Sequence, residues 1–407
     1  MPWFDARICE GLAWRGHHTT LVTFGGMDPN LLTGRAVVKV VDAARKPGGN
    51  NHFDELSKSG KSCWLSPRQR FAMEMRTFRK AFSLLSAEPH DVAHIFEFHP
   101  FTLLLAMRLF LSRRAASRTA FVAYLHLAGK LVSRGAGYLG AAQTALYRKA
   151  LAHVIQKRLQ GLIVMDPSLK RDLGNVLSFG DGSEKRILLL PHGMDAEDES
   201  SISRSEARRR LNIIFDGPLL LFFGILRRDK GLEVAIKAMS GLDFCQLMIF
   251  GTPFDWDPAG IRDFIREQGC EGSVSLEVGY CDDARMRDYF LASDVVLVPY
   301  TKSFQGQSGI LSRACTYGRG VIASDLPGIG ETVKEHRIGI AVEAESVDSL
   351  RQAILEFLAL EQQERELMEG RARALARQQS WDAVCSQLEK HYYRILQFKN
   401  ELDAVPE

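Results

Sequence analysis

Apolar runs without polar alternation recur along the second half of the chain, at residues 219–223, 246–250, 274–278, 295–298 and 321–323. Runs of this kind predict strands that are covered on both faces. The segments between them suit helices, and strands that alternate with helices predict a parallel sheet in an α/β fold. Two further helices are expected at residues 346–360 and 361–379, and a long final helix at 381–399.

The first half of the chain follows the same alternation. Strands are expected at residues 19–24, 37–41, 92–98, 120–125, 161–164 and 187–190, and helices at 67–85 and 101–112. The chain opens on residues 6–15, which have the pattern of the end of a helix that stops at Gly16. The charged segment 196–209 is poor in large apolar residues and predicts a link between two domains.

Composition narrows the class of protein. A chain of 407 residues suggests two or three domains, and 46% hydrophobic with 25% charged residues is typical of a globular protein. No apolar run has the length of a membrane span, and the first ten residues lack the pattern of a secretory signal. The seven cysteines lack C-x-x-C spacing, which favours a reducing cytosol over a disulfide or zinc framework. The net charge of +3 gives no indication of nucleic-acid binding.

Residues 295–331 predict a strand, a loop, a helix, a second strand and a flexible turn. Pro299 and Gly306 interrupt the apolar pattern before the helix begins. The backbone N–H groups of Gln307, Ser308 and Gly309 would then lie at a helix N-terminus, which suits a phosphate or a sugar hydroxyl. The alternative is a plain βαβ unit with a glycine-rich turn.

A second stretch, residues 219–231, predicts an apolar strand that ends at Gly224. Two arginines follow, and Lys230 and Gly231 open the next helix. Cations at the carboxyl end of a strand, beside a helix N-terminus, suit a diphosphate.

Together the two stretches resemble family-4 retaining glycosyltransferases of the GT-B fold, most closely a subgroup with F-G-x-x-R-x-x-K-G and with Q-S-G in place of E-x7-E. The matching residues are Phe223, Gly224, Arg227, Lys230 and Gly231, then Gln307, Ser308 and Gly309. Gln305 and Arg313 stand where the two glutamates would fall, and we assign them no role. The resemblance covers residues 219–396 well and the first half of the chain weakly.

The resemblance implies an α/β protein with two Rossmann-like, doubly wound domains facing a cleft. An N-terminal acceptor-binding domain is expected over residues 1–200 and a C-terminal domain for the nucleotide-sugar over 201–380. Residues 381–407 would form a helix that crosses back to the N-terminal domain. P-H-G-M-D at residues 191–195 resembles the turn that closes the first domain. Residues 15–24 resemble the junction of the first helix with the second strand, so we expect the N-terminal domain to lack its first strand and glycine-rich loop, which codons upstream of Met1 would encode.

The implied activity is transfer of a sugar from a nucleotide-diphosphate donor to an acceptor hydroxyl with retention, as by a hexosyltransferase in polysaccharide or glycolipid assembly. Arg227 and Lys230 would neutralise the diphosphate, with Gly224 beside them, and the amides of residues 307–309 would hold phosphate or sugar. Glu331 would bind the ribose, although a glutamate in the first turn of a helix is also favoured by the helix dipole. His126, at the end of a strand, would contact the transferred sugar, or be a structural histidine. The resemblance implies no cofactor beyond the donor, and front-face attack assisted by the leaving phosphate.

Three other motifs have alternative interpretations. Asp255-Trp256-Asp257 spells the D-x-D of metal-dependent transferases, but a cap for a helix near Pro258 explains it as well. Residues 135–140 spell G-x-G-x-x-G without the preceding strand and the acidic residue that a nicotinamide site needs. His94 and His99 would lie on opposite sides of one strand, which argues against a shared metal, and we predict no metal site.

Residues 98–165 contain no acidic residue. Ten basic residues lie in this span: Arg108, Arg113, Arg114, Arg118, Lys130, Arg134, Arg148, Lys149, Lys157 and Arg158. Such a run favours an anionic surface such as a lipid headgroup layer. It predicts a cytoplasmic protein, peripheral on the inner face of the membrane, that acts on a sugar or a lipid-linked acceptor. The alternative is a set of solvated basic helix faces.

Two other functions remain open on the sequence. One is a non-catalytic GT-B remnant that binds a nucleotide-sugar, which the missing E-x7-E pair would suit. The other is a nucleotide-sugar epimerase, which would need a pair of carboxylates for proton transfer. The sequence contains no convincing pair, and it leaves the sugar, the base and the acceptor open.

Overall fold

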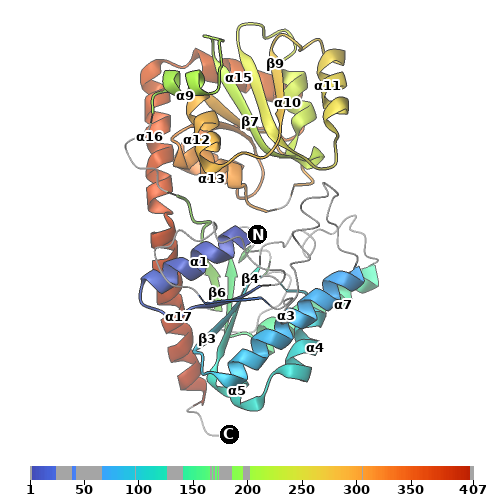
Figure 1. Ribbon diagram of the computed structural model, residues 1–407, viewed down its shortest axis with the longest axis vertical. Coiled ribbons are helices and arrows are strands. Elements are labelled where there is room, and N and C mark those ends of the chain that lie inside the picture. The colour runs from blue at the N-terminus through green and yellow to red at the C-terminus, as the bar shows by residue number, and fades with distance from the viewer. Residues whose placement is uncertain are drawn as a thin grey trace. The chain divides into compact units, whose positions relative to one another are not determined.

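The computed structural model describes residues 2–23, 39–42, 67–96, 98–125, 141–165, 186–195, 202–304 and 306–403, with residues 167, 170, 171 and 173. They fall into two compact units (Figure 1). Unit 1 comprises Met1–Pro191 and Trp381–Glu407, and unit 2 comprises His192–Ser380.

Unit 2 is built on one parallel sheet of six strands in the order β12-β11-β10-β7-β8-β9. Its strands are β7 (Leu219–Leu226), β8 (Gln246–Pro253), β9 (Val274–Val278), β10 (Val295–Val298), β11 (Gly320–Ser324) and β12 (Gly339–Val342). The five predicted strands are confirmed, although β7 and β8 continue beyond their predicted ends. The edge strand β12 was not predicted.

The helices of unit 2 begin where the sequence supplies caps. They are α9 (Arg204–Arg210), η3 (Arg228–Lys230), α10 (Leu232–Ala238), α11 (Pro258–Glu267), α12 (Asp283–Ala292), α13 (Gly309–Thr316), α14 (Gly330–His336), α15 (Val347–Ala359) and α16 (Gln362–Gln378). Asp282 caps α12 and Ser346 caps α15, each by accepting a hydrogen bond from a backbone N–H three residues on. Glu361 and Glu364 form a capping box at the start of α16.

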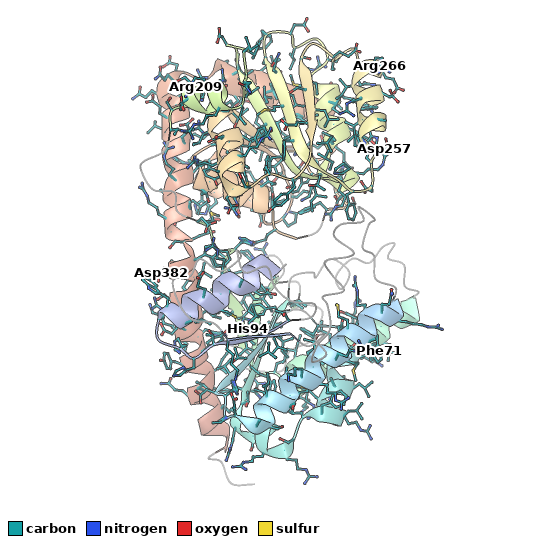
Figure 2. All side chains as sticks on the ribbon, viewed as in Figure 1. Phe71, His94, Arg209, Asp257, Arg266 and Asp382 are labelled. Atoms are coloured by element: carbon teal, nitrogen blue, oxygen red, sulfur yellow. The ribbon has the colours of Figure 1, made fainter. Side chains whose placement is uncertain are left out.

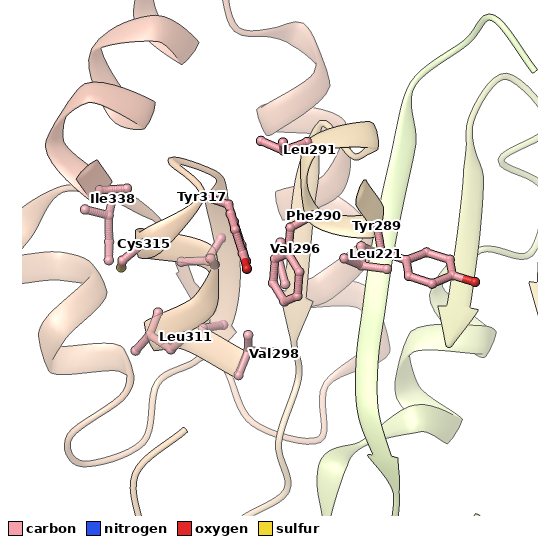
Figure 3. Close-up of a cluster of buried hydrophobic side chains, with 14 of the residues drawn as sticks. Leu221, Tyr289, Phe290, Leu291, Val296, Val298, Leu311, Cys315, Tyr317 and Ile338 are labelled. Carbon is pink, nitrogen blue, oxygen red and sulfur yellow. The ribbon is translucent and has the colours of Figure 1, made fainter. Parts of the chain in front are cut away.

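Both faces of this sheet are covered, which explains the uninterrupted apolar strands. One core contains side chains of β10, α12, α13 and α16, and Figure 3 shows part of it. There, Phe290 and Tyr317 face each other with ring centroids 5.3 Å apart. The second core lies between the sheet and α10, α11 and α15. Unit 2 is therefore a doubly wound domain.

Unit 1 also consists of parallel strands and helices. Its strands are β1 (Thr20–Thr23), β2 (Lys39–Asp42), β3 (Val92–Ile95), β4 (Ala120–Leu125), β5 (Gly161–Val164) and β6 (Ile187–Leu189). Its helices are α1 (Pro2–Trp14), α3 (Pro67–Ala87), α4 (Pro100–Phe110), α5 (Arg113–Arg118), α7 (Ala141–Lys157) and α17 (Trp381–Asp403). Strands β3, β4, β5 and β6 pair in that order, and β1 pairs with β2 in a separate sheet.

Alternate residues of β4 and β5 face two different cores of unit 1. Phe121 and Leu162 pack with side chains of α3, α4 and α7. Val122 and Ile163 pack with side chains of α1 and α17. The four-stranded sheet therefore has helices on both faces, as in a Rossmann-like domain (Figure 1).

Two local predictions were wrong. The segment predicted as a link contains α9, which belongs to unit 2. His99 does not share a strand with His94, because β3 ends at Ile95 and His99 is the N-cap of α4. The expectation of a further strand ahead of this chain stays a prediction.

Candidate functional site

The predicted donor-binding residues of unit 2 follow the carboxyl ends of three neighbouring strands. Strand β10 pairs with β7 on one side and with β11 on the other, and all three are parallel. The ends of parallel strands meet at one edge of a sheet, where open α/β sheets bind ligands. The three segments are residues 224–231 at the end of β7, 299–309 after β10 and 325–331 after β11.

Gly224 and Gly231 occupy positions that require glycine. Gly224 has a φ of +117°, and a Cβ added to it would lie 3.1 Å from Cδ1 of Ile310. Gly231 has a φ of +72°, and a Cβ there would lie 1.7 Å from the carbonyl oxygen of Pro299. Only glycine allows this close approach, so the segment after β7 packs directly against the segment after β10.

Arg227 lies at the start of the short helix η3 and is fixed by its own segment. Its Nε donates a hydrogen bond to Oδ1 of Asp229 at 2.5 Å, and its guanidinium lies 5.9 Å from the ring centroid of Phe254. About a third of the side chain remains exposed. A permanently charged group is thus held in place while part of it still faces solvent.

Lys230 is half-buried, and its ammonium nitrogen lies against two aromatic rings. Its Nζ lies 3.7 Å from the ring centroid of Tyr300 and 3.9 Å from that of Phe304. Burial, and to a smaller extent the nearby charge of Arg227, lower the pKa of Lys230 to about 7, against the opposing effect of Asp229. Two cations with different protonation behaviour therefore stand at the end of one strand.

Ser308 connects the second segment to α13. Its hydroxyl accepts a hydrogen bond from the N–H of Leu311 as the N-cap of the helix, and shares a 2.8 Å hydrogen bond with the hydroxyl of Tyr300. The side chain of Ser308 is therefore buried and structural. Gly309 opens the helix, and a Cβ added to it would meet no atom within 4 Å. The space beside this helix N-terminus suits an anion or a hydroxyl.

The two segments are also joined through their backbones. The N–H of Thr301 donates a hydrogen bond of 3.0 Å to the carbonyl oxygen of Asp229. Gly224, Arg227, Lys230, Ser308 and Gly309 consequently come together at one place on the sheet edge.

Glu331 lies in the first turn of α14. Its Oε2 accepts a hydrogen bond from the N–H of Gly328 at 3.3 Å. This contact supports the interpretation of Glu331 as a residue of the helix start, and the ribose contact stays a prediction.

Several candidates do not join this group. His126 lies outside the described residues, as do Gln305 and the glycine-rich motif at 135–140. Arg313 forms an ion pair of 2.9 Å with Asp195 and so ties α13 to the P-H-G-M-D turn.

The D-x-D motif is explained by capping. Asp257, which Figure 2 labels, caps α11 by accepting hydrogen bonds from the N–H groups of Ala259 and Gly260. Asp255 accepts a hydrogen bond from the N–H of Arg228. Within the described part of the chain, no three His, Cys, Asp or Glu side chains gather as a metal site would require.

Sequence reasoning missed three residues of this place: Asp229, Tyr300 and Phe304. Asp229 lies within R-R-D-K, between the two predicted cations. The aromatics lie in P-Y-T-K-S-F, immediately before the predicted phosphate-binding amides. The sequence signal for Tyr300 and Phe304 was the presence of two aromatic residues in a segment whose apolar residues follow neither a helix nor a strand period.

Residues 217–359 match the protein family described as Glycosyl transferases group 1. This range includes Arg227, Lys230 and the start of α13. The chain is also similar to the D-inositol 3-phosphate glycosyltransferase of Xylanimonas cellulosilytica, with 26% identity over 212 residues that cover 49% of each chain. The chain therefore spans about half the length of this relative.

Solved structures resemble nearly the whole chain. A sucrose-phosphate synthase from Thermosynechococcus elongatus has a TM-score of 0.72 at 20% identity, over 96% of this chain and 92% of that one. An Anabaena protein solved in complex with UDP and glucose has a TM-score of 0.63 at 15% identity, over 96% and 94%. The predicted GT-B fold is thus confirmed, and the match to Glycosyl transferases group 1 falls within unit 2.

Proposed function

We propose that this protein is a retaining hexosyltransferase that moves a sugar from a nucleotide-diphosphate donor to an acceptor hydroxyl. The observation that carries the proposal is the meeting of Arg227, Lys230 and the N-terminus of α13 at one edge of the unit 2 sheet. This place lies within the range that matches the glycosyltransferase family. The Anabaena protein of the same fold was solved with UDP, a nucleoside diphosphate.

Arg227 and Lys230 stabilise the diphosphate as negative charge develops on the leaving group. Removing one such fixed contact typically costs about 3–4 kcal/mol of transition-state stabilisation. The amides of residues 307–309 hold a phosphate or a sugar hydroxyl, Gly224 leaves room for the donor, and Glu331 binds the ribose. No divalent metal is needed, because two cations already face the diphosphate and Asp255 and Asp257 cap local backbone.

Unit 1 binds the acceptor, and His126 contacts the transferred sugar. No side chain described here stands as a nucleophile at the donor site, so the acceptor hydroxyl attacks on the face from which the diphosphate leaves. The leaving phosphate takes the proton of that hydroxyl. This path retains the configuration of the anomeric carbon.

A panel of nucleotide-sugars tests the proposal. Thermal shift identifies the donors that bind, and turnover with each acceptor class, followed by NMR of the anomeric proton, reads the reaction and its stereochemistry. Retained configuration with a chelator present supports the whole proposal, whereas inverted product or magnesium-dependent turnover contradicts the mechanism. Binding without turnover on any acceptor indicates the non-catalytic alternative, and a sugar epimerised on its nucleotide indicates an epimerase.

We also propose that unit 1 docks on an anionic membrane surface, where the acceptor is lipid-linked. Helix α4 exposes Phe101, Leu105 and Leu109, by 40%, 39% and 58%, at a spacing of four residues that places them on one helix face. Its Arg108 and the arginines of α5 are exposed nearby in sequence. No helix in the described ranges is long and apolar enough to span a bilayer. An apolar stripe beside arginines suits the headgroup layer.

A further inference from the structure

The side chains around Lys230 form an enclosure that ordinary phosphate binding does not require. We call Tyr300 and Phe304 the aromatic clamp. Their ring centroids lie 4.4 Å apart at an interplanar angle of 55°, and both rings lie within 4 Å of Lys230 Nζ. Ring faces attract an ammonium group, but they offer it no hydrogen-bond acceptor in place of water.

The clamp is anchored on both sides. Tyr300 is 3% exposed, and its hydroxyl is hydrogen-bonded to the buried N-cap Ser308. Thr301, the next residue, is hydrogen-bonded to the carbonyl of Asp229. Tyr300 is therefore fixed to the same helix N-terminus that would receive the donor, and the half-buried Phe304 packs against its ring.

Three charged or titratable groups face Lys230 from the packed elements. Arg227 and Asp229 belong to its own segment, and Tyr300 belongs to the segment after β10. The carboxylate of Asp229 is engaged by Arg227, and burial raises the pKa of Tyr300, so this phenol stays neutral. Burial and the nearby charge of Arg227 together hold the pKa of Lys230 near 7.

We propose that the aromatic clamp keeps Lys230 partly deprotonated in the empty site, so that a diphosphate binds together with a proton taken up at Lys230 Nζ. The inference rests on the proposed function, because it assumes that the site receives a diphosphate. The proton comes from solvent and converts the amine into an ammonium that pairs with the phosphate. Tyr300 and Phe304 are positioning residues, since they act through Lys230.

The proposed proton uptake makes the affinity for a diphosphate depend on pH. Well below pH 7, Lys230 is already charged and binding takes up no proton. Above pH 7, uptake approaches one proton per diphosphate, and affinity falls by up to about tenfold per pH unit. Binding is consequently strongest on the acidic side of neutrality.

Two measurements test the inference. Competitive acetylation of the intact chain with acetic anhydride between pH 5.5 and 10, read on the Lys230 peptide by mass spectrometry, gives the pKa of this amine without any ligand. Lys302, which is exposed in the same segment, is the internal reference. Calorimetric titration with UDP, GDP and ADP at pH 8, in two buffers of different ionisation enthalpy, gives the number of protons taken up, because their phosphates are already ionised at this pH. Pyrophosphate, which still holds a proton at pH 8, serves only as a test of binding.

Variants of Phe304 distinguish an effect of the aromatic clamp on the pKa of Lys230 from a general role of this side chain in packing. Phe304→Ser admits water and should move the labelling midpoint of Lys230 upward by at least about one pH unit, whereas Phe304→Leu keeps the enclosure apolar and should leave the midpoint near 7. Phe244→Leu, in an exposed aromatic before β8, is the matched control. A merely structural role for Phe304 would lower thermal stability in both Phe304 variants without moving the midpoint.

The expected result is a midpoint near pH 7 for wild-type Lys230, with proton uptake of more than half an equivalent at pH 8. A midpoint above 9, or binding at pH 8 without proton uptake, overturns this inference and leaves the proposed function standing. Failure of pyrophosphate and all three nucleotides to bind overturns the proposed function and this inference with it.

Discussion

Two neighbouring cations at one strand end have different chemical roles. Arg227 presents a planar fork of donors, whereas Lys230 is a single ammonium beside two aromatic rings. Asp229 is bound by Arg227 and leaves Lys230 without a direct carboxylate partner among the contacts described above. Arg227 and Lys230 therefore do not supply two equivalent positive charges, and neither residue can substitute for the other.

We expect Arg227→Ala and Lys230→Ala each to reduce turnover at least roughly a hundredfold while the chain stays folded, because each removes a charge that stabilises the leaving diphosphate. Arg228→Ala is the matched control, since Arg228 lies between them in sequence but pairs with Glu233 on the surface. Steady-state kinetics and circular dichroism measure the outcome. Wild-type rates in both folded variants would remove the diphosphate assignment.

A buried histidine of unit 1 governs acid stability. Burial lowers the pKa of His391 to about 4, below the usual 6.5 of an unfolded histidine. Between these values the unfolded chain binds more protons, so stability is present above pH 6.5 and is lost as pH falls toward 4, by up to about 3 kcal/mol. Urea unfolding at pH 7 and pH 4.5 should show a smaller loss in His391→Gln than in the exposed control His153→Gln. Equal losses in the two variants would contradict this account.

At the scale of elements, the local sequence pattern predicts the helices and strands whose stability comes from local features of the sequence. Five strands of unit 2 were predictable because both faces of the sheet are covered, and Ser308 and Gly309 indicated the start of α13. Helix α9 was missed because Ala207 is its one buried residue and gives it no apolar period. Ion pairs to distant residues help to hold it: Arg208 with Asp294 at 2.8 Å and Arg204 with Glu369 at 3.0 Å.

The same distinction applies to the candidate site, where some residues could be placed from the sequence and others could not. Gly224, Arg227 and Lys230 could be placed at a strand end because a parallel sheet directs such ends to one edge. The aromatic clamp could not, since the side-chain enclosure of Lys230 depends on how two loops distant in sequence pack.

We expect Asp294→Asn to destabilise unit 2 by about 3 kcal/mol. Its carboxylate accepts hydrogen bonds from Arg208 and from the N–H of Leu219, and asparagine leaves the largely buried Arg208 without a counter-charge. Asp263→Asn removes an exposed pair with Arg266 (Figure 2) and should change stability by less than about 1 kcal/mol. Thermal unfolding compares the two, and similar shifts would show that the α9 ion pairs are not structural.

The predicted binding of unit 1 to membranes depends on the exposed apolar face of helix α4. Leu105→Gln combined with Leu109→Gln should weaken binding to anionic vesicles severalfold, because both side chains leave the exposed stripe. Wild-type binding should fall as salt rises, since charges are screened over about 10 Å at 0.1 M salt. Leu367→Gln, in an exposed leucine of α16, is the control in unit 2. Vesicle sedimentation reads the effect, and equal partition onto neutral vesicles would remove the electrostatic basis.

At the scale of the whole molecule, the chain leaves unit 1 at Pro191 and re-enters it at Trp381. Helix α17 then covers one face of the unit 1 sheet with Val384, Cys385 and Leu388, all fully buried. Its start is tied to the end of α1, where Arg15 pairs with Glu389 at 2.8 Å. Unit 1 is thus discontinuous in sequence, and unit 2 is continuous.

Truncation after Ser380 should therefore unfold unit 1 and spare unit 2, because it removes α17, which together with α1 forms the core on one face of the unit 1 sheet. Limited proteolysis of the truncated chain should leave a resistant fragment of residues 192–380 and digest residues 1–191. The full-length chain, digested in parallel, should protect both. A protected N-terminal fragment in the truncated chain would show that α17 is dispensable for that fold.

The late return of α17 also sets an order of events during synthesis. Unit 1 leaves the ribosome first, yet the helix that completes it is translated only after unit 2. At about 5–20 residues per second, the ribosome needs roughly 10–40 s to make unit 2 in between. Through that interval α1 covers only part of the apolar sheet face that α17 will complete, so newly made protein should be most prone to aggregate before α17 emerges.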